Sequence, residues 1–128
     1  MKLSIIIPVF NEERTIREIL RRVNKVKLRN GVGKEIIVVD DCSTDQTPEI
    51  LSKIKDIKFK FLRHKENSGK GAAVKTGISN ISGDYVIIQD ADLEYDPNDY
   101  NKLLRPILKD QAKIVFGTRL KNYPLRFW

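Results

Sequence analysis

The fold class is decided by LSIIIP (residues 3–8), EERTIREILRRVNKV (12–26) and EIIVVD (35–40), three consecutive segments near the N-terminus. The first and third are short apolar runs rich in β-branched residues, which are typical of buried strands in a parallel sheet. In the segment between them, apolar residues recur with the spacing of one helix face, at Ile16, Ile19, Leu20 and Val23. The pattern therefore predicts a β-α-β unit.

The same alternation continues along the rest of the chain. Further strands are expected at 58–63, 84–90 and 112–117, and further helices are expected at 47–54, 69–81 and 97–108. Alternating elements with short connections favour one α/β domain over residues 1–128, with a mostly parallel sheet between two helical layers. Ligands of such sheets bind beyond the carboxyl ends of the strands, near a change in strand order. The site is therefore expected among the polar segments that follow the strands.

Composition narrows the class of protein. With 128 residues, 41% hydrophobic and 32% charged, the chain is typical of a globular domain. The net charge of +7 favours polyanionic partners in general, such as nucleic acid, phosphate groups or an anionic membrane surface, without choosing among them. Cys42 and His64 are the only residues of their types, so neither an internal disulfide nor a Cys/His zinc site is expected. The sequence shows neither a membrane-span pattern nor a signal-peptide pattern, so we expect a cytoplasmic location.

The segment DYVIIQDADLEYDPNDY (84–100) leads from an apolar run directly into five carboxylates. In an extended segment, alternate side chains point the same way about 6.6 Å apart, so Asp90 and Asp92 are expected to face one site. Glu94 joins them if the extension persists. Carboxylate oxygens without a nearby imidazole or thiolate suit a hard cation such as Mg²⁺ or Mn²⁺. Residues 96–99 are expected only to turn the chain and cap the next helix.

Two other segments carry candidate binding groups. In NSGKGAAVKTG (67–77), the glycines allow a ligand to approach the start of a helix, and Lys70 adds a positive charge. The spacing is not that of a P-loop, and a flexible helix start with an exposed lysine fits equally well. Asp40 and Asp41, which close EIIVVDD, are either acceptors for a ribose or base edge or a solvated strand end.

Five motifs together resemble a known family. They occur in order over essentially the whole chain, as IIIPVFNEE (5–13), IIVVDDCSTD (36–45), NSGKGAAVKTG (67–77), IIQDADLEYDP (87–97) and IVFGTR (114–119). These motifs are similar to those of the donor-binding half of family 2 glycosyltransferases, whose fold is the Rossmann-like GT-A fold. Within that family it most resembles the polyprenyl-phosphate sugar transferases, namely dolichyl-phosphate mannose synthases and dolichyl-phosphate glucosyltransferases.

The resemblance implies roles for individual residues. The nucleotide pocket would be lined by Pro8, Phe10 and Glu12. The base would be contacted by Val39 and Asp41, and the ribose and the metal-bound diphosphate would be held by Asp90, Ala91 and Asp92. Glu94 would be a third metal ligand, and Arg119 would contact the phosphates. Two positions depart from the family pattern, because Phe10 stands where tyrosine is common and Cys42 stands where glycine is common.

The resemblance implies an inverting transfer of a hexose from a UDP- or GDP-sugar to an acceptor, with a polyprenyl or dolichyl phosphate expected. A divalent metal bound by Asp90 and Asp92 would act as the Lewis acid on the leaving group. A phosphate acceptor is already an anion, so no general base is needed, and His64 is expected on the surface without a partner. Peripheral association with the cytoplasmic face of a membrane is also expected. The family's acceptor elements follow the last motif, so we expect the chain to be a truncated, donor-binding part.

Two alternatives from other classes remain open on the sequence. A receiver-like phosphoacceptor domain is also α/β and Mg²⁺-binding, and Asp40, Asp41 and Asp90 resemble its acidic residues, although the acidic pair follows the second strand rather than the first. The other is a basic nucleic-acid-binding module, suggested by KIKDIKFKFLRHK (53–65), but the lysines there alternate as solvent-facing strand positions do, so nucleic acid is not an expected partner. Within the family, a donor-binding fragment without transferase activity of its own is a further alternative.

Overall fold

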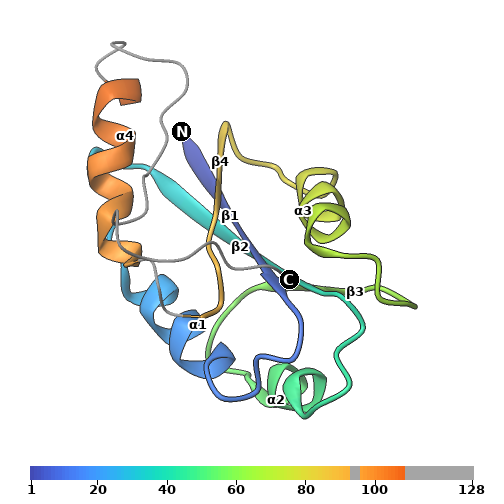
Figure 1. Ribbon diagram of the computed structural model, residues 1–128. Helices are drawn as coiled ribbons and strands as arrows, with labels where there is room; N and C mark the ends of the chain where they lie inside the picture. Colours follow the sequence, from blue (N-terminus) through green and yellow to red (C-terminus); the bar gives the residue numbers. More distant parts are fainter. Residues whose placement is uncertain (93–95, 109–128) are drawn as a thin grey trace, which may run out of the picture.

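The computed structural model describes residues 1–92 and 96–108, which form an α/β domain (Figure 1). The elements follow in the order β1 (Lys2–Val9), α1 (Ile16–Lys25), β2 (Gly33–Asp40), α2 (Thr47–Lys53), β3 (Lys60–Arg63), α3 (Lys70–Ile78), β4 (Tyr85–Ile88), the 3-10 helix η1 (Pro97–Asp99) and α4 (Tyr100–Leu108). The predicted alternation of strands and helices is therefore confirmed up to residue 108. The strand expected at 112–117 lies outside the described residues.

The described strands form one parallel sheet with the order β3-β2-β1-β4. In the register of the central strands, Ile5 pairs with Ile36 of β2 and with Ile87 of β4. The chain moves outward from β1 to β3 and then returns to the other side of β1, so the strand order changes between β1 and β4. In receiver domains the first strand lies between the second and the third, whereas here β1 lies between β2 and β4. The observed order therefore contradicts the receiver alternative.

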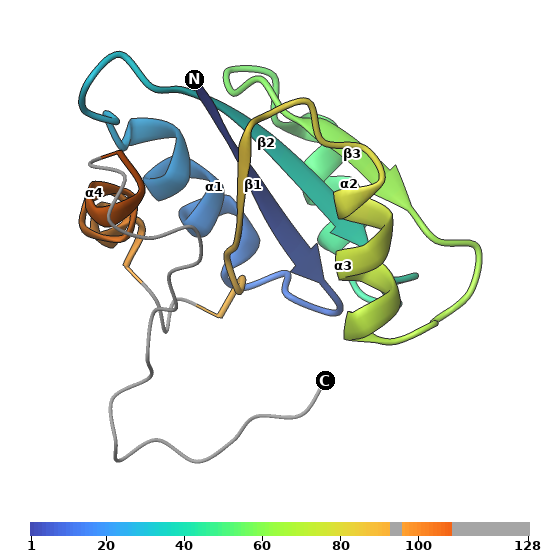
Figure 2. The ribbon, with the colours of Figure 1, turned by 90° about the horizontal axis from the view of Figure 1, so that it is seen from above.

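Helices cover both faces of the sheet, as the sequence predicts (Figure 2). On one face, α1 contributes a fully buried stripe to a core shared with β1, β2, α2 and α4, and this stripe consists of Ile16, Ile19, Leu20 and Val23. On the other face, Ala73 of α3 packs against Ile37 and Val39 of β2. Each buried Ile, Leu or Val side chain contributes about 1.5–3 kcal/mol relative to an exposed one, so the two cores hold the strand ends in place.

A glycine sets the distance between α3 and the sheet. A Cβ atom on Gly77 would lie 2.6 Å from Cγ2 of Ile6, closer than real Cβ contacts. Any larger residue would push α3 away from β1 and change the position of its N-terminus. In the part of the chain that is described, no helix is long and apolar enough to cross a membrane.

Two boundaries next to the site differ from the sequence expectation. The first helix begins at Ile16 rather than at residue 12, and the backbone N–H groups of Glu12 and Glu13 before it donate to Thr47, at the start of α2, and to Asp45, in the loop after β2. The fourth strand ends at Ile88 rather than at residue 90. Asp90 therefore follows the strand, and Ala91 and Asp92 lie in a turn, so the extended spacing expected to align the two aspartates is wrong.

Candidate functional site

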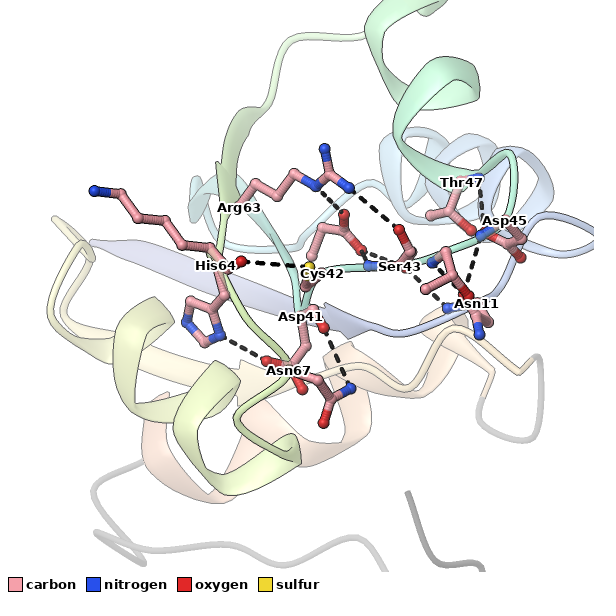
Figure 3. A network of polar contacts seen from close by, with 12 residues as sticks. Asn11, Asp41, Cys42, Ser43, Asp45, Thr47, Arg63, His64 and Asn67 are labelled. Carbon is pink, nitrogen blue, oxygen red and sulfur yellow. Dashed lines mark hydrogen bonds and ion pairs between the residues drawn. The ribbon is translucent and has the colours of Figure 1, made fainter.

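The loops after β1 and β2 are joined by a set of hydrogen bonds (Figure 3). Asn11, whose φ is 53°, donates its backbone N–H to Oγ of Ser43 at 2.9 Å. Its side-chain oxygen accepts from the backbone N–H groups of Thr44 and Asp45 at 2.8 and 3.3 Å. Because both loops are fixed by each other, the carboxyl ends of β1 and β2 form one connected edge.

The residues assigned to the first nucleotide-binding motif lie at this edge. Pro8 is buried in β1, and Phe10 is half-buried just beyond the strand end. The Glu12 carboxylate accepts from the Thr15 hydroxyl at 3.1 Å, and its backbone carbonyl accepts from the N–H of Ile16 at 2.9 Å. Glu12 therefore helps to start α1, a role that the sequence did not indicate.

Asp40 holds the loop after β2 together. Its side chain is fully buried, Oδ1 accepts from the backbone N–H and the hydroxyl of Ser43, and Oδ2 lies 3.1 Å from Nε of Arg63. The Oδ2 contact is an ion pair without hydrogen-bond geometry. Cys42 has a φ of 63°, so it adopts the left-handed conformation that glycine usually supplies. The Asp40 carboxylate thus stabilises the loop after β2 through Ser43 and Arg63.

Asp41 is buried in the same way but joins different elements. Its Oδ1 lies 2.7 Å from Nδ1 of His64 and accepts from the backbone N–H of Ser68 at 2.9 Å, while Oδ2 accepts from the N–H of Gly69 at 2.8 Å. Val39, which was predicted to contact the nucleotide base together with Asp41, is fully buried in the core under α3. The end of β2 is thereby connected to the loop that enters α3.

The expectation that His64 lies on the surface without a partner is wrong. Its side chain is only 16% exposed, and its second ring nitrogen, Nε2, lies 2.8 Å from Oγ1 of Thr76 on α3. The two partners are 23 and 12 residues away along the chain. No local sequence pattern predicts such a pairing, which depends on β2, β3 and α3 being neighbours in space.

Lys70 and Asp90 come together at the change in strand order. Lys70 begins α3, and its ammonium group forms a hydrogen-bonded ion pair with Oδ1 of Asp90, just after β4. The Asp90 side chain is 14% exposed and that of Lys70 is 38% exposed. Two motifs that the sequence expects at one edge are therefore in direct contact, with opposite charges.

The acidic segment is also fixed from the side of α4. The Gln89 side chain is buried, accepts from the Tyr100 hydroxyl at 2.6 Å and donates to the backbone carbonyl of Asp90 at 3.1 Å. Burial, with a smaller contribution from the charge of Asp96, raises the pKa of the Tyr100 phenol, so the hydroxyl remains a donor at neutral pH. The Asp96 carboxylate accepts from the N–H of Asn98, which confirms the predicted helix cap.

The remaining site residues are placed as follows. Ala91 is buried and Asp92 is half-buried in the turn after β4. Glu94 and Arg119 lie outside the described residues. Within residues 1–92 and 96–108, no group of three or more His, Cys, Asp and Glu side chains is arranged to hold a metal ion. Asp90 and Asp92 are the predicted metal ligands that the structure describes.

The family model described as glycosyl transferase family 2 matches residues 4–127. The chain is 35% identical to the dolichol-phosphate mannosyltransferase of Pyrococcus furiosus, over 97% of this chain and 36% of that protein. It is 33% identical to the undecaprenyl-phosphate 4-deoxy-4-formamido-L-arabinose transferase of Salmonella paratyphi B, over 94% of this chain and 37% of that protein. The chain thus spans little more than a third of the length of these curated relatives.

Solved structures of sugar-transferring enzymes are also similar to this chain. Glucosyl-3-phosphoglycerate synthase from Mycobacterium tuberculosis, in complex with Mn²⁺, UDP and glucosyl-3-phosphoglycerate, is 27% identical with a TM-score of 0.66, over 84% of this chain and 39% of that one. A mannosyltransferase from Pyrobaculum calidifontis, in complex with GDP-Man and Mn²⁺, is 29% identical with a TM-score of 0.63, over 76% of this chain and 29% of that one. The predicted GT-A architecture is confirmed by these similarities.

Proposed function

The chain belongs to glycosyl transferase family 2, and from this premise we propose that it binds a nucleotide-sugar donor at the carboxyl edge of its sheet for hexosyl transfer to a polyprenyl phosphate. We use the name carboxyl edge for the loops that follow β1, β2 and β4 together with the start of α3. The single observation that carries the proposal is the meeting of Lys70 and Asp90 at the change in strand order. Ligands of open α/β sheets bind at such a point.

The donor is proposed to be a UDP- or GDP-hexose. Similar proteins have been solved with UDP and with GDP-Man, which supports a nucleoside diphosphate without choosing the base. Phe10, half-buried beyond β1, is proposed to stack on the base. Lys70 offers a positive charge to the phosphates from the start of α3. The Arg119 guanidinium is proposed as a second phosphate contact, because its planar fork can bind two oxygens.

The residues at this edge fit a divalent cation, Mg²⁺ or Mn²⁺. Asp90 and Asp92 supply hard oxygen donors, and Asp90 already holds a cationic group, the ammonium of Lys70. We propose that Asp90, Asp92 and Glu94 hold the metal, with Asp90 and Asp92 as the catalytic carboxylates. When bound, the metal supplies the positive charge that stabilises the nucleoside diphosphate as a leaving group. Structures of similar proteins that contain Mn²⁺ support this choice of cofactor.

The acceptor is proposed from the two curated relatives, whose names include dolichol phosphate and undecaprenyl phosphate. A lipid phosphate is anionic at neutral pH, so its attack at the anomeric carbon needs no general base. A single attack from the face opposite the leaving nucleoside diphosphate would invert the configuration at that carbon. His64, the only histidine, is engaged with Asp41 and Thr76 and is not required as a base. Work at a lipid acceptor implies peripheral association with the cytoplasmic face of a membrane.

Calorimetric titration tests the proposal directly. UDP-glucose and GDP-mannose are added to the chain with Mn²⁺ and, separately, with EDTA. We expect one of the two donors to bind in the micromolar range with Mn²⁺ and at least tenfold more weakly in EDTA, a difference of about 1.4 kcal/mol. If neither donor, nor UDP or GDP alone, binds under either condition, the proposal is wrong. Equal affinity with Mn²⁺ and with EDTA would remove the metal but keep the donor.

A further inference from the structure

A buried polar pair lies between the end of β4 and the start of α4. Gln89 is 1% exposed and Tyr100 is 2% exposed, and the Tyr100 hydroxyl donates to Oε1 of Gln89 at 2.6 Å. Tyr100 belongs to the apolar core that α1 and β1 share. Burying an amide and a hydroxyl costs free energy that two apolar side chains of the same shape would avoid. Packing alone therefore does not account for these two residues.

We propose that Gln89 and Tyr100 are a positioning pair that fixes the turn after β4, and thereby the carboxylates of Asp90 and Asp92, for the divalent cation and the nucleotide-sugar donor. The inference rests on the proposed function for the identity of these ligands. It assigns neither Gln89 nor Tyr100 a contact with a ligand, because the pair acts through the backbone of the turn.

The first step leads from the sheet to the turn. The backbone N–H of Gln89 donates to the carbonyl of Ile6 at 2.8 Å, so Gln89 is still held by β1 although β4 ends at Ile88. Its side chain extends this support by one residue, because Nε2 donates to the backbone carbonyl of Asp90 at 3.1 Å. Asp92 follows in the turn. The orientation of the Gln89 amide thus controls how the acidic turn leaves the sheet.

The second step is the orientation of that amide by Tyr100. An amide carries an acceptor oxygen and a donor nitrogen, and it can present either one to a neighbour. The Tyr100 hydroxyl donates to Oε1, and this choice directs Nε2 to the Asp90 carbonyl. A reversed amide would place its oxygen against that carbonyl oxygen, which is unfavourable. Loss of the hydroxyl therefore removes the preference for the orientation that supports the turn.

The third step is the fixation of Tyr100 itself. Tyr100 is the first residue of α4, and the next residue, Asn101, joins this helix to the connection between α1 and β2. Oδ1 of Asn101 accepts from the N–H of Arg29 at 2.9 Å, and its Nδ2 donates to the carbonyl of Lys27 at 3.1 Å. The start of α4 is thus attached to a part of the chain far from the turn in sequence. Through Tyr100 and Gln89, this attachment also holds the turn.

Replacing the two residues singly and together tests the pair. Calorimetry with the donor identified for the parent measures the Mn²⁺-dependent affinity of Tyr100→Phe, Gln89→Met and the double variant. Each single change is expected to weaken binding roughly tenfold, and the double change is expected to weaken it no further. The midpoint of thermal unfolding without ligand is expected to behave differently. Each single change removes one partner of a buried polar group and lowers the midpoint, whereas the double change restores much of it, because two apolar groups then face each other.

This split between affinity and stability separates a positioning role from a packing role. Recovery of affinity together with stability in the double variant would overturn the inference, because the pair would then matter only for the core. Parent-like affinity in both single variants would overturn it as well. Tyr85→Phe is the matched control, since it removes a phenol hydroxyl at the other end of β4, and it is expected to leave donor affinity unchanged.

A measurement without ligand distinguishes this inference from the proposed function. Nitrogen-15 relaxation gives backbone order parameters for Ala91 and Asp92, and we expect these to fall by roughly 0.1 or more in folded Tyr100→Phe and in the double variant. Unchanged order parameters would overturn the positioning pair whatever the protein binds. A parent chain that binds neither donor nor nucleoside diphosphate would instead overturn the proposed function.

Discussion

The two ends of the sheet carry polar clusters of different kinds. At the amino edge, which we define by Ser4, Glu35, Lys60 and Ser82, the Glu35 carboxylate accepts from the Ser4 hydroxyl at 2.6 Å and from the N–H and hydroxyl of Ser82 at 2.6 and 2.7 Å. At the carboxyl edge, carboxylates face cationic side chains from other elements, as Asp90 faces Lys70. The amino edge is completed mainly by neutral donors, whereas the carboxyl edge holds charges that a charged ligand can engage.

The pKa of Glu35 reflects this difference. Burial by itself raises the pKa, but the hydrogen bonds from Ser4 and Ser82, with the nearby charge of Lys60, outweigh burial and lower it to about 2. The ionised Glu35 carboxylate at the amino edge therefore stabilises the folded state. We expect changes there to alter the free energy of unfolding, and changes at the carboxyl edge to alter ligand binding.

The largest effect is expected from Glu35→Gln. The change removes the charged acceptor of the Ser4 and Ser82 donors and is expected to lower the free energy of unfolding by about 2 kcal/mol. Urea denaturation measures this loss, with Glu49→Gln on the exposed side of α2 as the control. Donor affinity is expected to stay within twofold of the parent. A large loss of donor affinity in folded Glu35→Gln would contradict the separation of the two edges.

Asp92→Asn is the corresponding change at the carboxyl edge. Because a neutral amide is a poorer ligand for a hard cation, Mn²⁺-dependent donor binding is expected to weaken at least tenfold, about 1.4 kcal/mol. The midpoint of thermal unfolding without ligand is expected to remain close to that of the parent. Asp56→Asn, in the exposed connection between α2 and β3, is the charge-matched control. Unchanged affinity would remove Asp92 from the metal site.

Acid unfolding sharpens the comparison through Glu35. A folded-state pKa of about 2 lies below the ordinary glutamate pKa of 4.5. Glu35 therefore contributes stability that is fully present above about pH 5 and is lost as the pH falls from 4.5 toward 2. The parent is expected to lose on the order of 1 kcal/mol more over this range than Glu35→Gln. Parallel pH profiles of the two proteins in urea titrations would contradict this assignment.

The smallest effect is expected from Arg119→Lys, at a residue outside the described part of the chain. The change keeps the positive charge but removes the planar fork that binds two phosphate oxygens. We expect roughly threefold weaker donor binding, about 0.7 kcal/mol, with Arg105→Lys on α4 as the control. Calorimetry with the donor identified for the parent measures the difference. If both variants bind as the parent does, Arg119 is not a phosphate contact.

Much of the fold could be predicted from the sequence, because burial on both faces of β1 and β2 requires long apolar runs such as SIIIPV and IIVV. The helical face of α1 could be predicted for the same reason, since its period of apolar residues is local. Boundaries next to the site were less predictable. The residues before α1 are held by hydrogen bonds to Asp45 and Thr47, and the residues after β4 are held by Tyr100 and Lys70, and these contacts have no signature within the segments themselves.

The candidate site divides in the same way. The expectation that Lys70 and Asp90 share one edge follows from the direction of parallel strands, and their direct contact supports it. The role of His64 could not be predicted, because its partners depend on the order β3-β2-β1-β4 and on the position of α3 over β2. The burial of Asp41 likewise depends on the loop that enters α3.

The sequence by itself determined the class of fold, the family and the edge of the sheet at which charged residues gather. These properties follow from local hydrophobic period and from motif order, which need no knowledge of contacts. Only the tertiary structure decided which charge faces which, because an ion pair or a buried hydrogen bond requires two segments to lie within about 3 Å, and that distance is set by strand order and helix packing. For this reason Asp40 and Asp41, adjacent in the sequence, hold different parts of the molecule, one paired with Arg63 and the other with His64.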